Sequence, residues 1–134
     1  MSDPGSEIDE FLASLPDKLE QEIAAEFADA VEEIMVEPIR DAAPEGERGH
    51  LKASVRKDPG RDDFEWIVEA GGPLTTKPVR DGATATYDYA EGVEFGNSHM
   101  NAEPFFWPTV RVQQQPMQER CEEILDNAMQ KLGG

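Results

Sequence analysis

A stripe of apolar residues near the N-terminus constrains the fold of this 134-residue chain more than any other sequence feature. Acidic residues fill the positions between them, so the segment predicts one amphipathic helix that turns its apolar face to a core. Pro16 suits the first turn with Ser14 as its cap, and Pro38 is expected to kink or end the helix. The stripe recurs at spacings of three and four residues: Leu12, Leu15, Leu19, Ile23, Phe27, Val31 and Ile34.

A second stripe of helical spacing lies between Thr109 and Leu132 and predicts a C-terminal helix. Pro116 is expected either to kink this helix or to restart it at a first turn, and Gly133 with Gly134 is expected to end it. The stripe consists of Val110, Met117, Cys121, Ile124, Ala128 and Leu132, with Leu125 beside it.

The segment between these helices has the pattern of short strands and turns. "FEWIVEA" (64–70) alternates clearly and "LKASVRK" (51–57) weakly, so we expect them to pair as a hairpin around "DPGRDD" (58–63). Residues 71–86 are rich in Gly, Pro and small polar side chains, which predicts a long loop with a short extended arm around Thr76–Arg80.

The fold class predicted from these patterns is α+β. It consists of a long N-terminal amphipathic helix, a small, mostly antiparallel sheet with a long inserted loop, and a C-terminal helix. Residues 1–10 are expected to be a disordered acidic N-terminus, and residues 11–134 to form a single domain.

Composition and charge limit the classes of function. The net charge is −17, and residues 1–47 carry 15 acids against two bases. Such a surface repels phosphate, which argues against a protein that grips DNA or RNA, although a solvated helix face is the ordinary explanation for it. No apolar run approaches the roughly 20 residues of a membrane span, and "MSDPGSEIDE" does not look like a secretory signal. With a single cysteine, we expect a soluble protein made in a reducing cytoplasm.

Candidate catalytic and metal-binding residues are few. His50, His99 and Cys121 are scattered, and Cys121 lies on an apolar stripe where cysteine is usually a core residue. Glu91 and Glu94 are three apart, so on a helical turn they would share a face and could act as an acid–base pair. Alternatively, one of them caps a neighbouring backbone or pairs with an arginine such as Arg48 or Arg111. We therefore expect no catalytic residue, metal or cofactor.

Aromatic residues gather in "EPFFWP", where Pro104 and Pro108 stiffen the chain on either side. The ordinary interpretation is that Phe105 with Trp107, or Phe106 alone, packs onto the N-terminal helix, and we expect this of at least one of the three. A core of this size has little room for all three aromatics, so an assembly interface is the expected place for the remainder.

Two segments resemble the signatures of a known family. "AAPEGERGHLKASV" (42–55) resembles the "A-P-x-x-T-G-x-L-x-x-S-[IV]" signature of the HK97 gp10-like phage tail-component proteins. "YDYAEGVEFGNSHMNAEPFFWPTV" (87–110) resembles that family's "Y-A-x-x-V-E-F-G-T … P-A-x-P-F-[LF]-x-P-A" segment. With the flanking helices, the resemblance covers roughly residues 15–132. The chain departs from the pattern at Arg48, Asn97 and Asn101, where the family usually has Thr, Thr and Pro.

The resemblance implies a structural virion protein at the head–tail junction of a tailed bacteriophage, made in the host cytoplasm. Such a protein is a subunit of a ring, usually six-fold, that completes or terminates the tail and joins it to the head. The implied partners are further copies, the tail-tube protein and neighbouring connector proteins of the stopper or adaptor type. Genomic DNA would pass through the channel without specific binding. No enzyme activity, cofactor or membrane is implied.

The motif residues that we expect to form interface or structural contacts are Gly49, Leu51, Tyr89, Glu94, Phe95, Gly96, Pro104, Phe105, Phe106, Trp107 and Pro108. Within the loop, Leu74, Lys77, Val79 and Arg80 are expected to reach a neighbouring subunit. Three alternatives stay open. They are a stopper or connector ring nearer the portal, a small acidic enzyme that uses Glu91 or Glu94, and a DNA mimic that blocks a nucleic-acid enzyme through its acidic helix.

Overall fold

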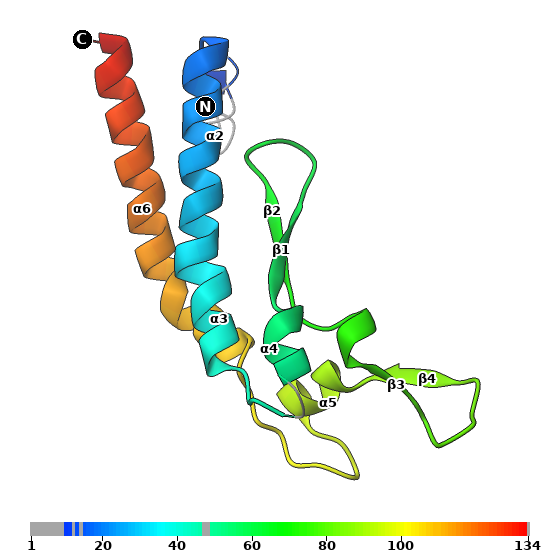
Figure 1. Cartoon of the computed structure of the whole chain (residues 1–134). Helices are drawn as coiled ribbons and strands as arrows, with labels where there is room; N and C mark the ends of the chain where they lie inside the picture. The colour runs from blue at the N-terminus through cyan, green and yellow to red at the C-terminus, as the bar shows by residue number, and fades with distance from the viewer. Residues whose placement is uncertain (1–9, 12, 14, 47–48, 134) are drawn as a thin grey trace.

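The computed structural model describes residues 10, 11, 13, 15–46 and 49–133. Residues 1–9 of the predicted disordered N-terminus, the Leu12 position of the stripe, the Ser14 cap and any pairing by Arg48 lie outside these residues. Glu10, which was also predicted to be disordered, is helical. The chain folds as a stem of two antiparallel helical segments, with two small hairpins and two short helices arranged beside and below the lower part of the stem (Figure 1). The α+β prediction is therefore confirmed, with both sheets antiparallel.

The N-terminal segment of the stem is not one uniform helix. It consists of α2 (Asp17–Val31), a π-helical turn η1 (Glu32–Val36) and α3 (Glu37–Ala42), which follow one another directly. Within η1 the N–H of Glu37 donates to the carbonyl of Glu32, five residues back. The widened turn lies just before Pro38, whose ring would otherwise clash with the carbonyl four residues earlier.

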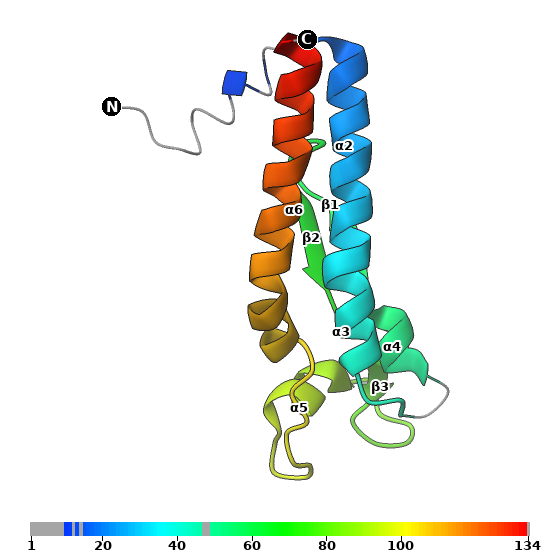
Figure 2. The same cartoon turned by 90° about the vertical axis from the view of Figure 1, so that its left-hand side faces the viewer.

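The C-terminal helix α6 (Trp107–Gly133) runs antiparallel to α2 and lies beside it in both views (Figures 1 and 2). It continues through Pro116, so the proline does not restart a helix there. The side-chain amide of Gln113 on α6 donates to the backbone oxygen of Ile34, 2.9 Å away. In a regular helix the carbonyl of Ile34 would accept from the N–H of residue 38, but Pro38 has no N–H. The side chain of Gln113 supplies a donor in its place.

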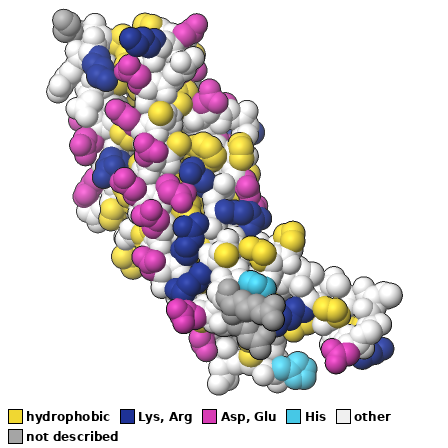
Figure 3. All heavy atoms as spheres, viewed as in Figure 1, with side chains coloured by type: hydrophobic (Ala, Val, Ile, Leu, Met, Phe, Trp, Pro, Cys, Tyr) yellow, Lys and Arg dark blue, Asp and Glu magenta, His cyan; other side chains and the backbone are white. Residues whose placement is uncertain are grey.

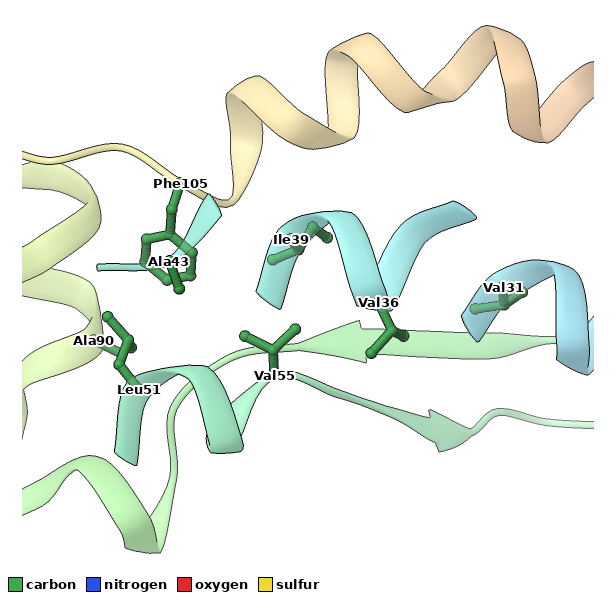
Figure 4. Packing of buried hydrophobic residues seen from close by; sticks show 8 residues of the cluster. All are labelled: Val31, Val36, Ile39, Ala43, Leu51, Val55, Ala90 and Phe105. Atoms are coloured by element: carbon green, nitrogen blue, oxygen red, sulfur yellow. The ribbon is translucent and has the colours of Figure 1, made fainter. Parts of the chain in front are cut away.

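Two clusters of buried residues form the core. In the upper stem, residues of both predicted stripes pack together with Ala30, which neither stripe included: Leu15, Ile23, Ile124 and Ala128. At the base of the stem, the second cluster joins the helical segments to the rest of the fold (Figure 4). Its members are Val31, Val36, Ile39, Ala43, Leu51, Val55, Ala90 and Phe105. The two apolar stripes were thus predicted correctly for most of their described residues, but Leu132 at the end of the second stripe is 46% exposed.

The first hairpin pairs β1 (Arg56–Pro59) with β2 (Trp66–Glu69) in antiparallel register, with Arg56 opposite Glu69. The pairing was predicted, but the assignment of 51–57 as a strand is wrong in its first half. Residues His50–Ser54 form a short helix, α4, which follows Gly49 in the left-handed region at φ +66°. Leu51 and Ser54 are both buried, and this spacing of three is helical, whereas the alternation of a strand has a period of two.

Residues 71–86 are more ordered than the predicted loop. They contain the 3₁₀ turn η3 (Pro73–Thr75) and the strand β3 (Thr76–Pro78), which pairs with β4 (Thr86–Asp88). We call residues 76–88 the arm, because this hairpin extends away from the stem and from α4 (Figure 1). The helix α5 (Tyr89–Phe95) follows the arm directly. None of the helices within the described ranges is both long and apolar enough to cross a membrane.

Candidate assembly interface

Asp88 fixes the base of the arm. Its carboxylate accepts hydrogen bonds from the N–H of Gly72 (2.6 Å), the hydroxyl of Thr75 (2.5 Å) and the N–H of Ala90 (2.9 Å). Burial opposes the charge, but these hydrogen bonds, together with the nearby Arg56, lower the pKa of Asp88 below its ordinary value. Asp88 thereby caps α5 and ties that helix to both ends of the arm.

Glu94 caps a helix that begins 13 residues later in the chain. One carboxylate oxygen accepts from the N–H of Phe105 (2.8 Å) and of Phe106 (2.9 Å), and the other accepts from Trp107 (3.1 Å). These amides lie at and just before the start of α6, where a helix has no acceptors of its own and favours a negative charge. The side chain is only 6% exposed. Of the interpretations left open for the two acids, the structure confirms capping for Glu94.

Glu91 is placed differently from Glu94. It is exposed on α5 and, among the residues described, it makes no hydrogen bond or ion pair. The two acids lie three residues apart on α5 and both line one groove, as expected for a shared face, but Glu94 is buried against the start of α6 whereas Glu91 is exposed. The three backbone bonds also give Glu94 a structural task that occupies both of its oxygens.

The three consecutive aromatic residues have three different environments. Phe105 is 2% exposed and belongs to the basal cluster, where it lies beside Ala43 (Figure 4). Phe106 is half-buried and Trp107 is 50% exposed, and their rings meet edge to face at 5.1 Å. The packing of Phe105 in one cluster with Val36 and Ile39 agrees with the expectation that at least one aromatic residue packs onto the N-terminal helix, but Trp107 does not pack with it. Glu94 sets the turn into α6, and this turn sends Phe105 inward and leaves Trp107 at the surface.

A groove of about 490 Å³ lies between β2, α5 and the first turn of α6. Its apolar wall includes Val68, Phe95, Phe106 and Trp107, and Phe95 is 64% exposed. Its charged residues are Arg56, Glu69, Asp88, Glu91 and Glu94. Apart from Glu91 these charged groups are already engaged: Arg56 binds Glu69 at 3.0 Å, for example, and also donates to the carbonyl of Gly71 at 2.6 Å.

The arm carries exposed apolar side chains on a hairpin that packs on little of its own chain. Val79 is 51% and Tyr87 is 47% exposed, and Leu74 just before the arm is also exposed. The ammonium of Lys77 lies over the ring of Tyr89, 5.0 Å from its centroid, whereas Arg80 is exposed near the tip. In the space-filling view a basic and an acidic side chain lie together at the far end of the arm (Figure 3).

The remaining predicted residues are distributed between core, turns and surface. Leu51 is buried with Ala90 and Phe105, so segments 42–55 and 87–110 meet in one cluster. Gly49 and Gly96 both have positive φ, and Gly96 lets the chain turn closely past Ala102. Tyr89 is half-buried at the start of α5, Pro104 is exposed, and Pro108 lies in the first turn of α6.

His50, His99 and Cys121 do not come together. Across the described ranges, no group of three or more His, Cys, Asp or Glu side chains is placed to hold a metal ion. Cys121 is half-buried on α6, and burial, helped by the carboxylate of Glu122, raises the pKa of its thiol. A thiol in that environment stays protonated and behaves as a small apolar side chain.

Sequence reasoning missed the role of Asp88, although a signal for it exists. Asp88 is followed three residues later by Glu91 at the start of a helical segment, which is the spacing of a capping box. Comparison with known proteins adds nothing to this geometry: no family model, curated protein or solved structure matches the chain.

Proposed function

We propose that this chain is a structural protein of a tailed-phage virion, which forms a six-fold ring at the head–tail junction and completes or terminates the tail. The observation that carries the proposal is the arm, a two-stranded hairpin that projects from the body with Val79 and Tyr87 exposed. An isolated two-stranded hairpin is marginally stable in water at best. A hairpin of this kind is best explained as a contact element that gains its packing from another subunit.

The position of the groove supports a ring. It lies on the body of the subunit, whereas the exposed side chains of the arm lie away from the body. A subunit whose two contact surfaces differ associates head to tail, and repeated head-to-tail contacts close into a ring when the rotation allows it. Two dissimilar unpartnered surfaces on one small fold therefore favour a cyclic assembly over a two-fold dimer.

The family resemblance supports the place of the ring in the virion. The two segments that resemble the phage tail-component signatures contribute Leu51, Ala90 and Phe105 to one buried cluster, so they act together as a structural unit. In the second segment Glu94 is a helix cap, which agrees with a role in assembly and not in turnover. We accordingly propose no enzyme activity and no cofactor.

The negative net charge of the chain suits a ring through which DNA moves without binding. Acidic side chains lie along the visible face of the stem with Lys and Arg side chains among them (Figure 3), and the net charge of the chain is −17. An acidic wall repels the phosphate backbone and keeps DNA from sticking as it moves through a channel. We propose that the acidic stem of each subunit faces this channel, and that the ring binds the tail-tube protein below and a connector protein above.

Electron microscopy of the purified protein, alone and with tail tubes of the phage that encodes it, tests this proposal. We expect six-fold rings, and we expect them at the head-proximal end of the tubes. Rings that instead co-purify with DNA-filled heads and not with tails would move the protein to a stopper position near the portal. A chain that forms no ring in either sample would overturn the proposal.

A further inference from the structure

The arm and the groove complement each other. We propose that the arm of one copy lies in the groove of the next copy, with Arg80 of the arm paired to Glu91 beside the groove. This inference rests on the proposed ring and names the contact that closes it. It is carried by three properties of the described residues: the reach of the arm, the apolar surfaces on both sides, and the two charges without partners.

The reach of the arm rules out its own groove. Gly72 and Asp88, at the base of the arm, line the groove themselves. From Thr76 the extended chain advances about 3.3 Å per residue, which takes Arg80 roughly 13 Å outward. Because the hairpin points away from α5 and the start of α6, its tip does not fold back over its own groove (Figure 1). A second copy is the nearest source of a groove of this shape.

The apolar surfaces match in kind. Val79 and Tyr87 are about half exposed on the arm, and Phe95 and Trp107 are at least half exposed at the groove. Each surface leaves large side chains in water when the subunit is alone. A groove of about 490 Å³ is large enough to take side chains of the arm, so docking would remove both surfaces from water together.

The charges are complementary. The whole chain is strongly acidic, but the projecting part of the arm is not. It carries two bases, Lys77 and Arg80, and one acid, Asp81, because Asp88 is engaged at the base of the arm. At the groove, Arg56 faces four acids: Glu69, Asp88, Glu91 and Glu94. Three of these acids already bind groups of their own subunit. In the part of the chain that is described, Glu91 and Arg80 form no ion pair, which makes them the pair left for an intersubunit contact.

Charge reversal tests the pairing. We would compare wild-type protein with Arg80→Glu, Glu91→Arg and the double variant, and measure assembly by sedimentation over a range of protein concentrations. Each single variant places like charges together, and a loss of about 1.4 kcal/mol is tenfold in affinity. We therefore expect each to raise the concentration for half-assembly at least about tenfold. The double variant should return to within about threefold of the wild type.

The control is Asp126→Arg, a charge reversal at an exposed site on α6. At 1.5 Å per residue, Asp126 lies roughly 28 Å along the helix from Trp107, so the change should leave assembly at the arm unaffected. Both arm and groove variants replace exposed side chains, and an unchanged unfolding midpoint would verify that each remains folded. A second groove variant, Trp107→Ser, should weaken assembly without any change of charge.

The outcomes separate this inference from the proposed function. A wild-type ring that is insensitive to both single charge reversals overturns the arm-in-groove contact and leaves the ring standing. A two-fold dimer that the single variants weaken and the double variant restores supports the contact but overturns the ring. Wild-type protein that stays a monomer at every concentration overturns both. Saturation of the groove by a peptide or small molecule that does not compete with assembly also counts against the arm as its occupant.

Discussion

Replacing Glu94 is expected to destabilise the fold, because this one carboxylate satisfies three backbone amides. In Glu94→Ala the buried N–H of Phe105 loses its acceptor. An unsatisfied buried donor of this kind costs about 1–3 kcal/mol. The amides of Phe106 and Trp107 are nearer the surface and lose a cap, at about 0.5–1 kcal/mol each. Together these terms predict a loss of roughly 2–5 kcal/mol in the free energy of unfolding.

Glu94→Gln should be milder. The amide oxygen of Gln can still accept from Phe105 and Phe106, but its NH₂ group would face the N–H of Trp107, where the second carboxylate oxygen now accepts. We expect a loss of about 1–2 kcal/mol from this variant, since one bond is lost and the others no longer involve a charge.

Urea unfolding followed by circular dichroism at one fixed protein concentration measures these losses, because association contributes to apparent stability. Glu91→Ala is the matched control. It removes an exposed carboxylate from the same helix, and its effect should stay within about 0.5 kcal/mol. A loss below about 1 kcal/mol for Glu94→Ala, or an equal loss for Glu91→Ala, would refute the assignment of Glu94 as the cap of α6.

Four further substitutions probe the base of the arm, the turns and the stem. Asp88→Asn should cost about 1–3 kcal/mol at neutral pH. The pKa of Asp88 is lowered in the fold, so the carboxylate stabilises the wild type fully above its ordinary pKa near ~3.9. The difference in free energy of unfolding between wild type and Asp88→Asn should therefore shrink as pH falls through the lower, folded pKa. A difference that grows in acid would contradict this. Gly96→Ala should cost about 2–4 kcal/mol, since φ is +77° and the new Cβ would lie 2.9 Å from the backbone nitrogen of Ala102. Gly49→Ala is the control, because Gly49 also has a positive φ (+66°) but has open space around it, and it should cost only about 1 kcal/mol. If urea unfolding gave equal losses for Gly96→Ala and Gly49→Ala, the close approach at Gly96 would not be the cause. Gln113→Leu removes the donor to a backbone carbonyl of η1 and should lower the thermal midpoint by an amount equivalent to about 1–2 kcal/mol, whereas an unchanged midpoint would show that water replaces it.

The helices of the stem could be predicted because their burial repeats along the sequence. Leu15, Ile23 and Val31 are buried at the positions that their spacing indicates, and so are Ile124 and Ala128. The π-helical turn could not be predicted in the same way. Pro38 signals a disturbed helix, but the group that completes the turn is Gln113, which is distant in sequence. Only the packed structure brings the two together.

The middle of the chain was predicted less well, because short segments carry little periodicity. Five residues of α4 do not distinguish a period of two from one of three, so Leu51 and Ser54 read as part of a strand. The arm has no apolar face toward its own core, so the alternation that normally marks a strand is absent from it. The sequence around Thr76 therefore indicated an extended piece of chain but not its partner strand.

Only part of the candidate site was named from the sequence, and its geometry was not predicted. The motif residues from Glu94 to Trp107 were named, yet which aromatic faces the core depends on the hydrogen bonds of a single acid across the turn. A clue was present: Phe105 and Phe106, just before the helix that begins at Trp107, are not the short polar side chains that usually cap one. A helix without a local cap needs an acceptor from elsewhere in the chain.

Sedimentation equilibrium of the wild-type protein over a wide range of concentrations tests directly whether the chain forms a ring. The subunit has a mass of 14.9 kDa, and we expect the measured mass to rise with concentration to a single closed multiple, which is six subunits for the proposed ring. A mass that stays at one subunit throughout, including in the presence of tail tubes, would contradict the claim that the chain forms a ring.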